Sequence, residues 1–243
     1  MQNLNTHISK TMNEEDIINF NTAINLYKKN LTQQELINLI AKGTITEKQV
    51  SVLKLEKLTS EEDAKILLSN LTGQDGKVRE AISFKLKEFM NDPQYINYFY
   101  SLDDYSVFLD AIVDINGNIC RNIISAIENL KDYKKFYEYF CPQIAKKTLD
   151  LIEKIKKFDL QDGKYKVNKE VFKLYWCLET IYNFYDKFDM PTLKVILSNT
   201  KEVQDYTIRE KTAKILSKEL QNPELLKIKQ ELKEDKNYYV RRF

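Results

Sequence analysis

The chain of 243 residues contains few of the residues that interrupt regular structure or perform common catalytic chemistry: 5 glycines, 4 prolines, 3 cysteines and a single histidine, His7. Sheet sandwiches and nucleotide-binding α/β folds need many turn residues and glycine-rich phosphate loops, so this shortage excludes both classes. One histidine excludes most histidine-based catalysis. The cysteines show no Cys-x-x-Cys spacing, which excludes a disulfide framework or a zinc site and favours a reducing, cytoplasmic location.

Long apolar runs and an excess of one charge are also missing. Lys and Arg number 38 against 36 Asp and Glu, so the formal net charge is only +2. Charged residues interrupt every apolar run before it reaches the roughly 18 residues of a membrane span, and we expect no membrane partner. The N-terminus has no basic start followed by an apolar core, so we expect no signal peptide.

Helix signals, in contrast, run through the whole chain. Capping-box spacings occur at Thr32-x-x-Glu35 and Thr59-x-x-Glu62, each just before an apolar run. The prolines are expected in first turns, where the missing N–H costs nothing, and they are Pro93, Pro142, Pro191 and Pro223. The expected helices cover residues 14–29, 33–42, 46–58, 60–71, 77–90, 93–101, 104–115, 118–130, 132–140, 143–158, 168–187, 191–199, 206–220 and 223–234.

An internal repeat is the strongest pattern. Residues 66–70 (ILLSN) match residues 195–199 (VILSN), and after one inserted residue the match resumes between 74–80 and 204–210. The common element is a short helix, a turn with Asp or Asn, and a longer helix that begins with Val or Ile three residues later. This element is expected at Asp75/Val78, Asn116/Ile119, Asn168/Val171, Asp205/Ile208 and Asn237/Val240. Two-helix repeats of this length predict a solenoid, in which stacked neighbours bury each other's apolar stripes.

These turns resemble the HEAT-repeat family, whose unit is two antiparallel helices with Asp in the turn and Val-Arg opening the second helix. The likeness is closest at 75–81, 205–210 and 237–242, whereas Cys120 and Phe172 stand where arginine is expected. The resemblance implies an all-α, right-handed α-solenoid of stacked antiparallel helix pairs over residues 59–243. Residues 1–58 match nothing in the family, and we expect them to form an irregular helical cap.

The resemblance also implies a non-catalytic scaffold that presents a concave helical surface to a protein or peptide partner. The sequence contains no catalytic constellation, metal-ligand set or phosphate-binding loop, so we expect no enzyme activity, metal or cofactor. The candidate partner-binding residues are Arg79, Arg121, Arg209, Tyr175 and Trp176.

Each candidate has a structural alternative. The repeat arginines either pair with an Asp of the same or the next turn or form a ladder that binds anions. The chain has 28 aromatic residues, of which 20 lie in residues 95–188. Most of these are expected to pack between repeats, Trp176 among them, while Tyr and Trp could also line a binding groove.

Nucleic acid is the alternative partner. Charge is segregated, because residues 88–128 hold seven acids and one base while residues 131–173 hold twelve bases and seven acids. Basic residues that alternate with aromatic ones are typical of nucleic-acid grooves. Some alkylpurine DNA glycosylases are built of HEAT-like repeats and use an acid in an aromatic groove, to which Tyr175, Trp176 and Glu179 are similar without a matching motif.

Overall fold

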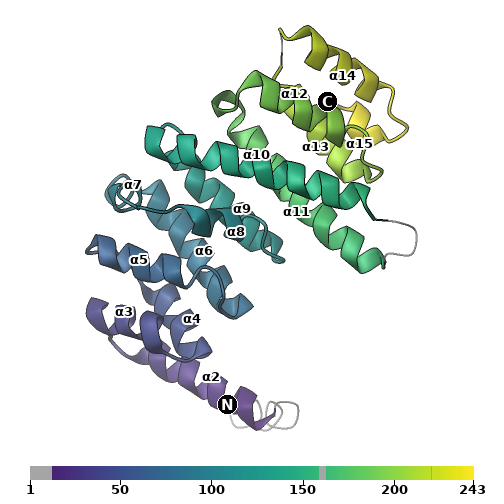
Figure 1. The fold of residues 1–243 in the computed structure, drawn as a ribbon. Coiled ribbons are helices and arrows are strands. Elements are labelled where there is room, and N and C mark those ends of the chain that lie inside the picture. The colour runs from purple at the N-terminus through teal and green to yellow at the C-terminus, as the bar shows by residue number, and fades with distance from the viewer. Residues whose placement is uncertain (1–12, 159–162, 220) are drawn as a thin grey trace. The chain divides into compact units, whose positions relative to one another are not determined.

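All regular structure is helical in the part of the chain that the computed structural model describes, residues 13–158, 163–219 and 221–243 (Figure 1). The all-α class predicted from the sequence is confirmed. The α-helices are α2 (Glu14–Lys28), α3 (Gln33–Lys42), α4 (Ile45–Lys54), α5 (Glu61–Ser69), α6 (Gly76–Asn91), α7 (Asn97–Tyr100), α8 (Ser106–Ala111), α9 (Gly117–Ile127), α10 (Lys134–Lys156), α11 (Lys164–Asn183), α12 (Met190–Thr200), α13 (Tyr206–Leu216), α14 (Pro223–Lys233) and α15 (Tyr238–Arg241). Two short 3₁₀ turns are η1 (Glu128–Leu130) and η2 (Tyr185–Lys187).

The chain folds into two compact units, Met1–Phe99 and Tyr100–Phe243. In unit 1, α3 packs against α4 and α5 against α6, while α3 also contacts α5 and α4 contacts α6. The two helix pairs are therefore stacked, and α2 extends the row of second helices by packing on α4. The boundary predicted between residues 58 and 59 lies in the loop that joins α4 to α5, and the separate cap over residues 1–58 stays a prediction.

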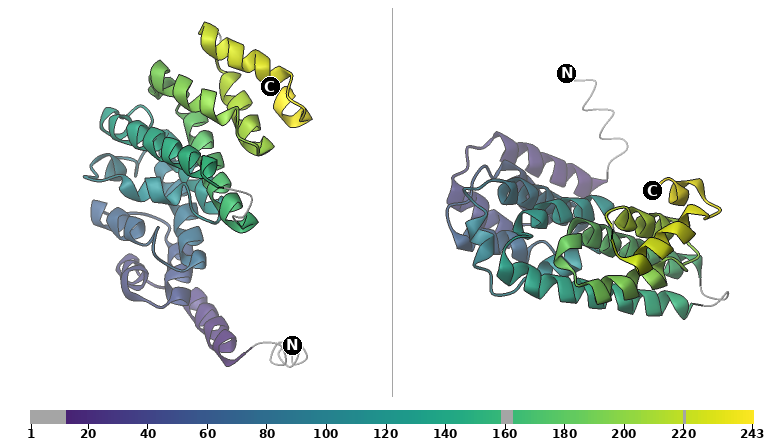
Figure 2. Two further views of the ribbon diagram at one scale, coloured as in Figure 1. Left: turned by 45° about the vertical axis from the view of Figure 1, so that its right-hand side comes forward. Right: turned by 90° about the horizontal axis from the view of Figure 1, so that it is seen from above.

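Unit 2 repeats the same arrangement over four pairs: α8–α9, α10–α11, α12–α13 and α14–α15. The first helices contact one another in the order α8, α10, α12, α14, and the second helices in the order α9, α11, α13, α15. Figure 2 shows α10 and α11 side by side with α12 and α13 stacked on them. Each unit is thus an α-solenoid, because every pair buries its apolar faces against its sequence neighbours.

The turns that join the two helices of a pair follow the predicted Asp/Asn pattern. Four of these residues accept a hydrogen bond from the backbone N–H two positions later, at 2.8 to 2.9 Å, and so cap the second helix: Asp75, Asn116, Asp205 and Asn237. The Val or Ile three residues after each cap is buried, with at most 1% of its surface exposed. The pattern therefore marks both where the second helix begins and which face enters the core.

Three local predictions are wrong. Asn168 lies inside α11, which begins at Lys164 after Gly163 and has no side-chain cap. Pro142 lies inside α10, although proline donates no hydrogen bond to the Glu138 carbonyl. The helix continues through it because α10 packs on α8, α11 and α12, and tertiary burial outweighs the local cost.

The third concerns the capping box at residue 59. The box predicted at Thr32 is present, with both reciprocal hydrogen bonds to Glu35. In the second case Ser60, not Thr59, caps α5 by accepting from the Asp63 N–H. The Thr59 N–H and hydroxyl both donate to the Asp63 carboxylate instead. The acid that bonds back to Thr59 is therefore four residues later in the chain, not three.

Part of the aromatic set of residues 95–188 packs in the core between α8, α10 and α11. The buried rings there are Tyr105, Phe108, Phe136, Phe140 and Phe184. The rings of Tyr105 and Phe136 meet edge to face at 5.1 Å, and Phe140 stacks on Phe136 at 4.8 Å. Phe184 closes this cluster at 5.7 Å from Phe140. Phe136, Phe140 and Phe184 are fully buried, so these rings hold unit 2 together and are not available to a partner.

Candidate functional site

A hollow of about 260 Å³ opens on the row of second helices in unit 2 and is lined from α9, α11 and α13. Three of the five predicted partner-binding residues meet there, Arg121 from α9 and the neighbours Tyr175 and Trp176 from α11. We call this surface the groove. Its remaining lining residues are Ile124, Ser125, Glu128, Glu179, Asn183 and Lys211.

Trp176 forms the wall of the groove next to the core. Only 7% of its surface is exposed, and its ring lies edge on to Tyr175 at 5.3 Å and to Phe172 at 6.1 Å. Gly117 opens α9 opposite this ring, and a Cβ there would approach the indole Cζ2 to 3.3 Å. The small residue lets α9 pack closely on α11, so Trp176 serves packing and the groove at once. Among the described residues its buried indole N–H has no hydrogen-bond acceptor.

Glu179 ties the neighbouring helix to the groove. Its carboxylate pairs with Lys211, which is mostly buried, and with Lys214 at 3.1 Å, both on α13. Burial opposes ionisation of this carboxyl, but hydrogen bonds and charge from the two lysines outweigh burial and lower the pKa of Glu179. The same pairing raises the pKa of Lys211 against the effect of its burial. Glu179 and Lys211 are therefore both charged at neutral pH, and the ion pairs of Glu179 fix α11 against α13.

Two lysines of α13 and Lys218, which follows this helix, also cover tyrosine rings of α11. The Lys211 Nζ lies 4.4 Å from the Tyr175 centroid, and the Lys214 and Lys218 Nζ atoms each lie 4.1 Å from the Tyr182 centroid. Lys218 donates in addition to the Tyr182 carbonyl at 2.6 Å, and partial burial lowers its pKa. These cation–π contacts leave the groove with tyrosine faces that are already occupied.

Arg121 differs from the other cations of the groove. It is exposed, and its guanidinium donates to the Asn118 side chain at 3.2 Å. No ion pair within the described residues includes Arg121. Arg242, which follows α15, shows the contrast, because its guanidinium pairs with Glu210 of α13. The Arg121 guanidinium therefore stands at the groove with most of its five donors available for a ligand.

The other two predicted arginines lie in the first turns of second helices, Arg79 in α6 and Arg209 in α13. Arg209 donates to the Val203 and Gln204 carbonyls at 2.8 and 2.6 Å and forms a two-pronged pair with Asp235, at 2.6 and 3.3 Å. Asp235 belongs to the next turn, so the pairing expected with an Asp of the same or the next turn is formed with the next. Arg79 donates to the Gln74 carbonyl of its own turn. A role for either in partner binding stays a prediction.

The groove residues that sequence reasoning missed are Ile124, Ser125, Glu128, Asn183 and Lys211. A signal for Lys211 exists in the spacing, since Glu179 and Lys211 are 32 residues apart and Glu210 and Arg242 are also 32 apart. In both cases an acid on one second helix meets a base 32 residues later, on the next second helix or just after it. Nothing local marks Ser125 and Glu128, which join the groove only because α9 packs beside α11.

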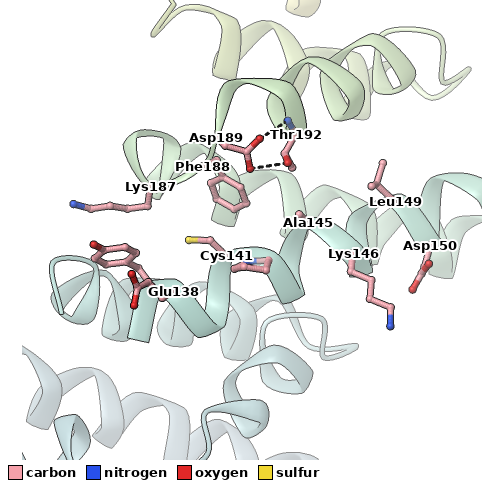
Figure 3. Close-up of a pocket in the computed structure, with 12 residues that line it drawn as sticks. Glu138, Cys141, Ala145, Lys146, Leu149, Asp150, Lys187, Phe188, Asp189 and Thr192 are labelled. Carbon is pink, nitrogen blue, oxygen red and sulfur yellow. Dashed lines mark hydrogen bonds between the residues drawn. The ribbon is translucent and has the colours of Figure 1, made fainter. Parts of the chain in front are cut away.

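A second hollow, of about 560 Å³, lies between α10 and the start of α12 (Figure 3). Its floor is apolar and includes Cys141 and Phe188, whose side chains face the space between the two segments (Figure 3). Lys146 and Asp150 point away from it in the same view. A ligand site needs polar groups that converge, so this hollow lacks the features that orient a small molecule.

The described cysteines do not fit a nucleophile. Cys120, Cys141 and Cys177 are all buried and unpaired, and burial raises the pKa of each thiol to about 12. A thiol with such a pKa stays protonated at neutral pH. In the same described ranges, no cluster of three His, Cys, Asp or Glu side chains could hold a metal ion. None of the helices described combines the length and apolarity needed to cross a bilayer.

Comparison with known proteins gives a likeness of fold and no match by sequence. No family model matches the chain, and no curated protein matches it. Among solved structures, the designed armadillo repeat protein YIII(Dq)4CqI is similar at 11% sequence identity and a TM-score of 0.44, over 87% of this chain and 96% of that one. The chain is a helical repeat protein on the contacts of its own helices, and membership of the HEAT-repeat family stays a prediction.

Proposed function

We propose that this protein is a non-catalytic scaffold that binds a peptide segment of a protein partner in the groove on α9, α11 and α13. The observation that carries the proposal is the meeting of Arg121, Tyr175 and Trp176 in one hollow. Arg, Tyr and Trp are the residue types that contribute most to binding energy at protein interfaces. The hollow of about 260 Å³ is smaller than the roughly 300–1,000 Å³ of small-molecule sites, and its size suits one side chain of a longer segment.

The groove is also held rigid before any partner arrives. Glu179 pairs with two lysines of α13, and the side chain of Lys211 is only 10% exposed. A preorganised surface loses little conformational entropy on binding, so more of the contact energy appears as affinity. The same ion pairs support a role without catalysis, because the one acid within the groove's interior is already neutralised by two bases.

A displayed library of random 12-residue peptides tests the proposal. Peptides selected on the wild-type protein are measured again on Ser125→Trp, which fills the hollow, and on Gln143→Trp, which adds the same ring to an exposed position of α10. We expect binding to be lost at least about tenfold in the first variant and kept in the second. Ser125→Gln provides a milder block if the first variant unfolds. Selection that yields no peptide sensitive to either groove variant would overturn the proposal.

Nucleic acid is supported by one observation, the aromatic groove with Glu179 beside Tyr175 and Trp176. Two features weaken it. Trp176 is buried, and Lys211 covers one face of Tyr175, so little aromatic surface in the groove is left for a base to stack on. A gel shift with short duplex and single-stranded DNA decides, since phosphate contacts are strongest at low salt. A shift at low salt that Ser125→Trp abolishes would favour this alternative over a peptide.

A further inference from the structure

We infer that the segment bound in the groove is acidic and that one of its carboxylates pairs with Arg121. This inference rests on the proposed function and names the class of partner. It starts from the charges that α9, α11 and α13 present at the groove. Arg121 and Lys211 line it together with the acids Glu128 and Glu179. Two further cations lie beside the lining residues, Lys214 on Glu179 and Lys218 over the Tyr182 ring.

The excess positive charge is not spread evenly. Glu179 is shared between Lys211 and Lys214, which accounts for one carboxylate and two cations in the middle of the groove. Lys218 contacts a backbone carbonyl and the Tyr182 ring. Arg121 contacts only the Asn118 amide oxygen among the described residues. The cation with the most unused hydrogen-bonding capacity is therefore the exposed arginine.

The chemistry of that arginine selects a carboxylate. A guanidinium presents parallel N–H donors that match the two oxygens of a carboxylate, and such charge-assisted pairs are about twice as strong as neutral hydrogen bonds. Glu128, at the C-terminal end of α9, is one of the charges that act on Lys218, beyond the C-terminal end of α13. Glu179 lines the groove one helical turn after Tyr175, but its carboxylate is paired with Lys211 and Lys214, so it repels an incoming carboxylate little.

The apolar wall of the groove suggests a second feature of the bound segment. Ile124 and Trp176 are both buried groove residues, with 4% and 7% of their surfaces exposed, and they give the hollow an apolar wall beside Arg121. A segment with an acidic residue next to an apolar one can satisfy both at once. We therefore expect groove-binding peptides to carry an Asp or Glu close to a medium-sized apolar side chain.

The test uses the peptides that the display experiment identifies as groove binders, labelled with fluorescein and measured by fluorescence anisotropy. We expect Asp and Glu to be enriched in these peptides. Replacing the acidic residue by its amide should weaken binding about tenfold, and Arg121→Gln should do the same to the protein. Arg121→Lys should recover part of the loss, since it restores the charge without the fork.

Lys134→Gln is the matched control, because it removes one exposed positive charge from α10 and should leave binding unchanged. The charge swap is the sharpest arm: Arg121→Glu should prefer a peptide with Lys in place of its acid. Groove binders without acid enrichment, or an Arg121→Gln variant that binds as Lys134→Gln does, would overturn this inference and leave the proposed function standing. Displacement of the peptide by a 12-nucleotide single-stranded DNA at lower concentration than by unlabelled peptide would also overturn it.

Discussion

Two turns of unit 2 solve the same structural problem with different side chains. Arg209 is the fourth residue after the Asp205 cap and lies in the first turn of α13. Cys120 holds the same place after the Asn116 cap, in the first turn of α9. Both side chains donate to the carbonyl two residues before their cap, Arg209 to Val203 at 2.8 Å and the Cys120 thiol to Asp114 at 3.1 Å. Arg241, after the Asn237 cap, donates to the Asp235 carbonyl in the same way.

The difference teaches what the position requires and what arginine adds. The turn needs one donor, because a buried carbonyl without a partner costs free energy. A thiol satisfies that need at short range. Arginine also reaches Asp235 of the next turn, so it links one helix pair to the next, and the loss of arginine at residue 120 leaves the α8–α9 pair without that link.

Removing the link should have the largest effect. Arg209→Leu leaves the Asp235 carboxylate, whose side chain is 9% exposed, without its partner and also removes donors from two carbonyls. We expect a loss of about 3–5 kcal/mol in the free energy of unfolding, measured with urea. Arg121→Leu is the control, because that side chain is exposed and unpaired within the described residues, and it should change stability by less than about 0.5 kcal/mol. Equal losses of unfolding free energy in the two variants would contradict a stabilising role for the Arg209–Asp235 pair.

Weakening the short-range donor should cost less. Cys120→Ala removes both the sulfur volume and the hydrogen bond to Asp114, and we expect a loss of about 1–2 kcal/mol in urea unfolding. Cys120→Ser keeps a donor at the same position and should lose less than the alanine variant. If serine is no better than alanine, packing and not the hydrogen bond is what the position needs.

The smallest expected effect is a dependence on pH. Hydrogen bonds from Arg209 outweigh burial and hold the pKa of Asp235 below its usual value of about 3.9. A lowered folded-state pKa stabilises the protein above the unfolded-state value, and this stability is lost as pH falls through the folded-state pKa. The unfolding free energy should therefore fall from pH 5 towards pH 2 more steeply in the wild type than in Asp235→Asn. Parallel slopes would show that Asp235 does not titrate with folding.

The sequence predicts much of this fold for a local reason. Asp75, Asn116, Asp205 and Asn237 cap second helices because a short polar side chain can bond the backbone two residues later, whatever the rest of the chain does. Pro142 shows the limit of that approach, since α10 continues through it under tertiary packing. The burial of Trp176 was likewise predictable, because a large aromatic ring stabilises a core more than it does an exposed surface.

The groove itself was only partly predictable. Arg121, Tyr175 and Trp176 could be named from residue type, but Lys211 and Glu128 enter the same surface from other helices. By itself the sequence determined the helices, their caps and the stacking of pairs, because periodic apolar residues and turn chemistry act within a few residues of each other. Tertiary structure decided which charges are neutralised, since only the packing of α9, α11 and α13 brings Glu179 onto two lysines and leaves Arg121 exposed.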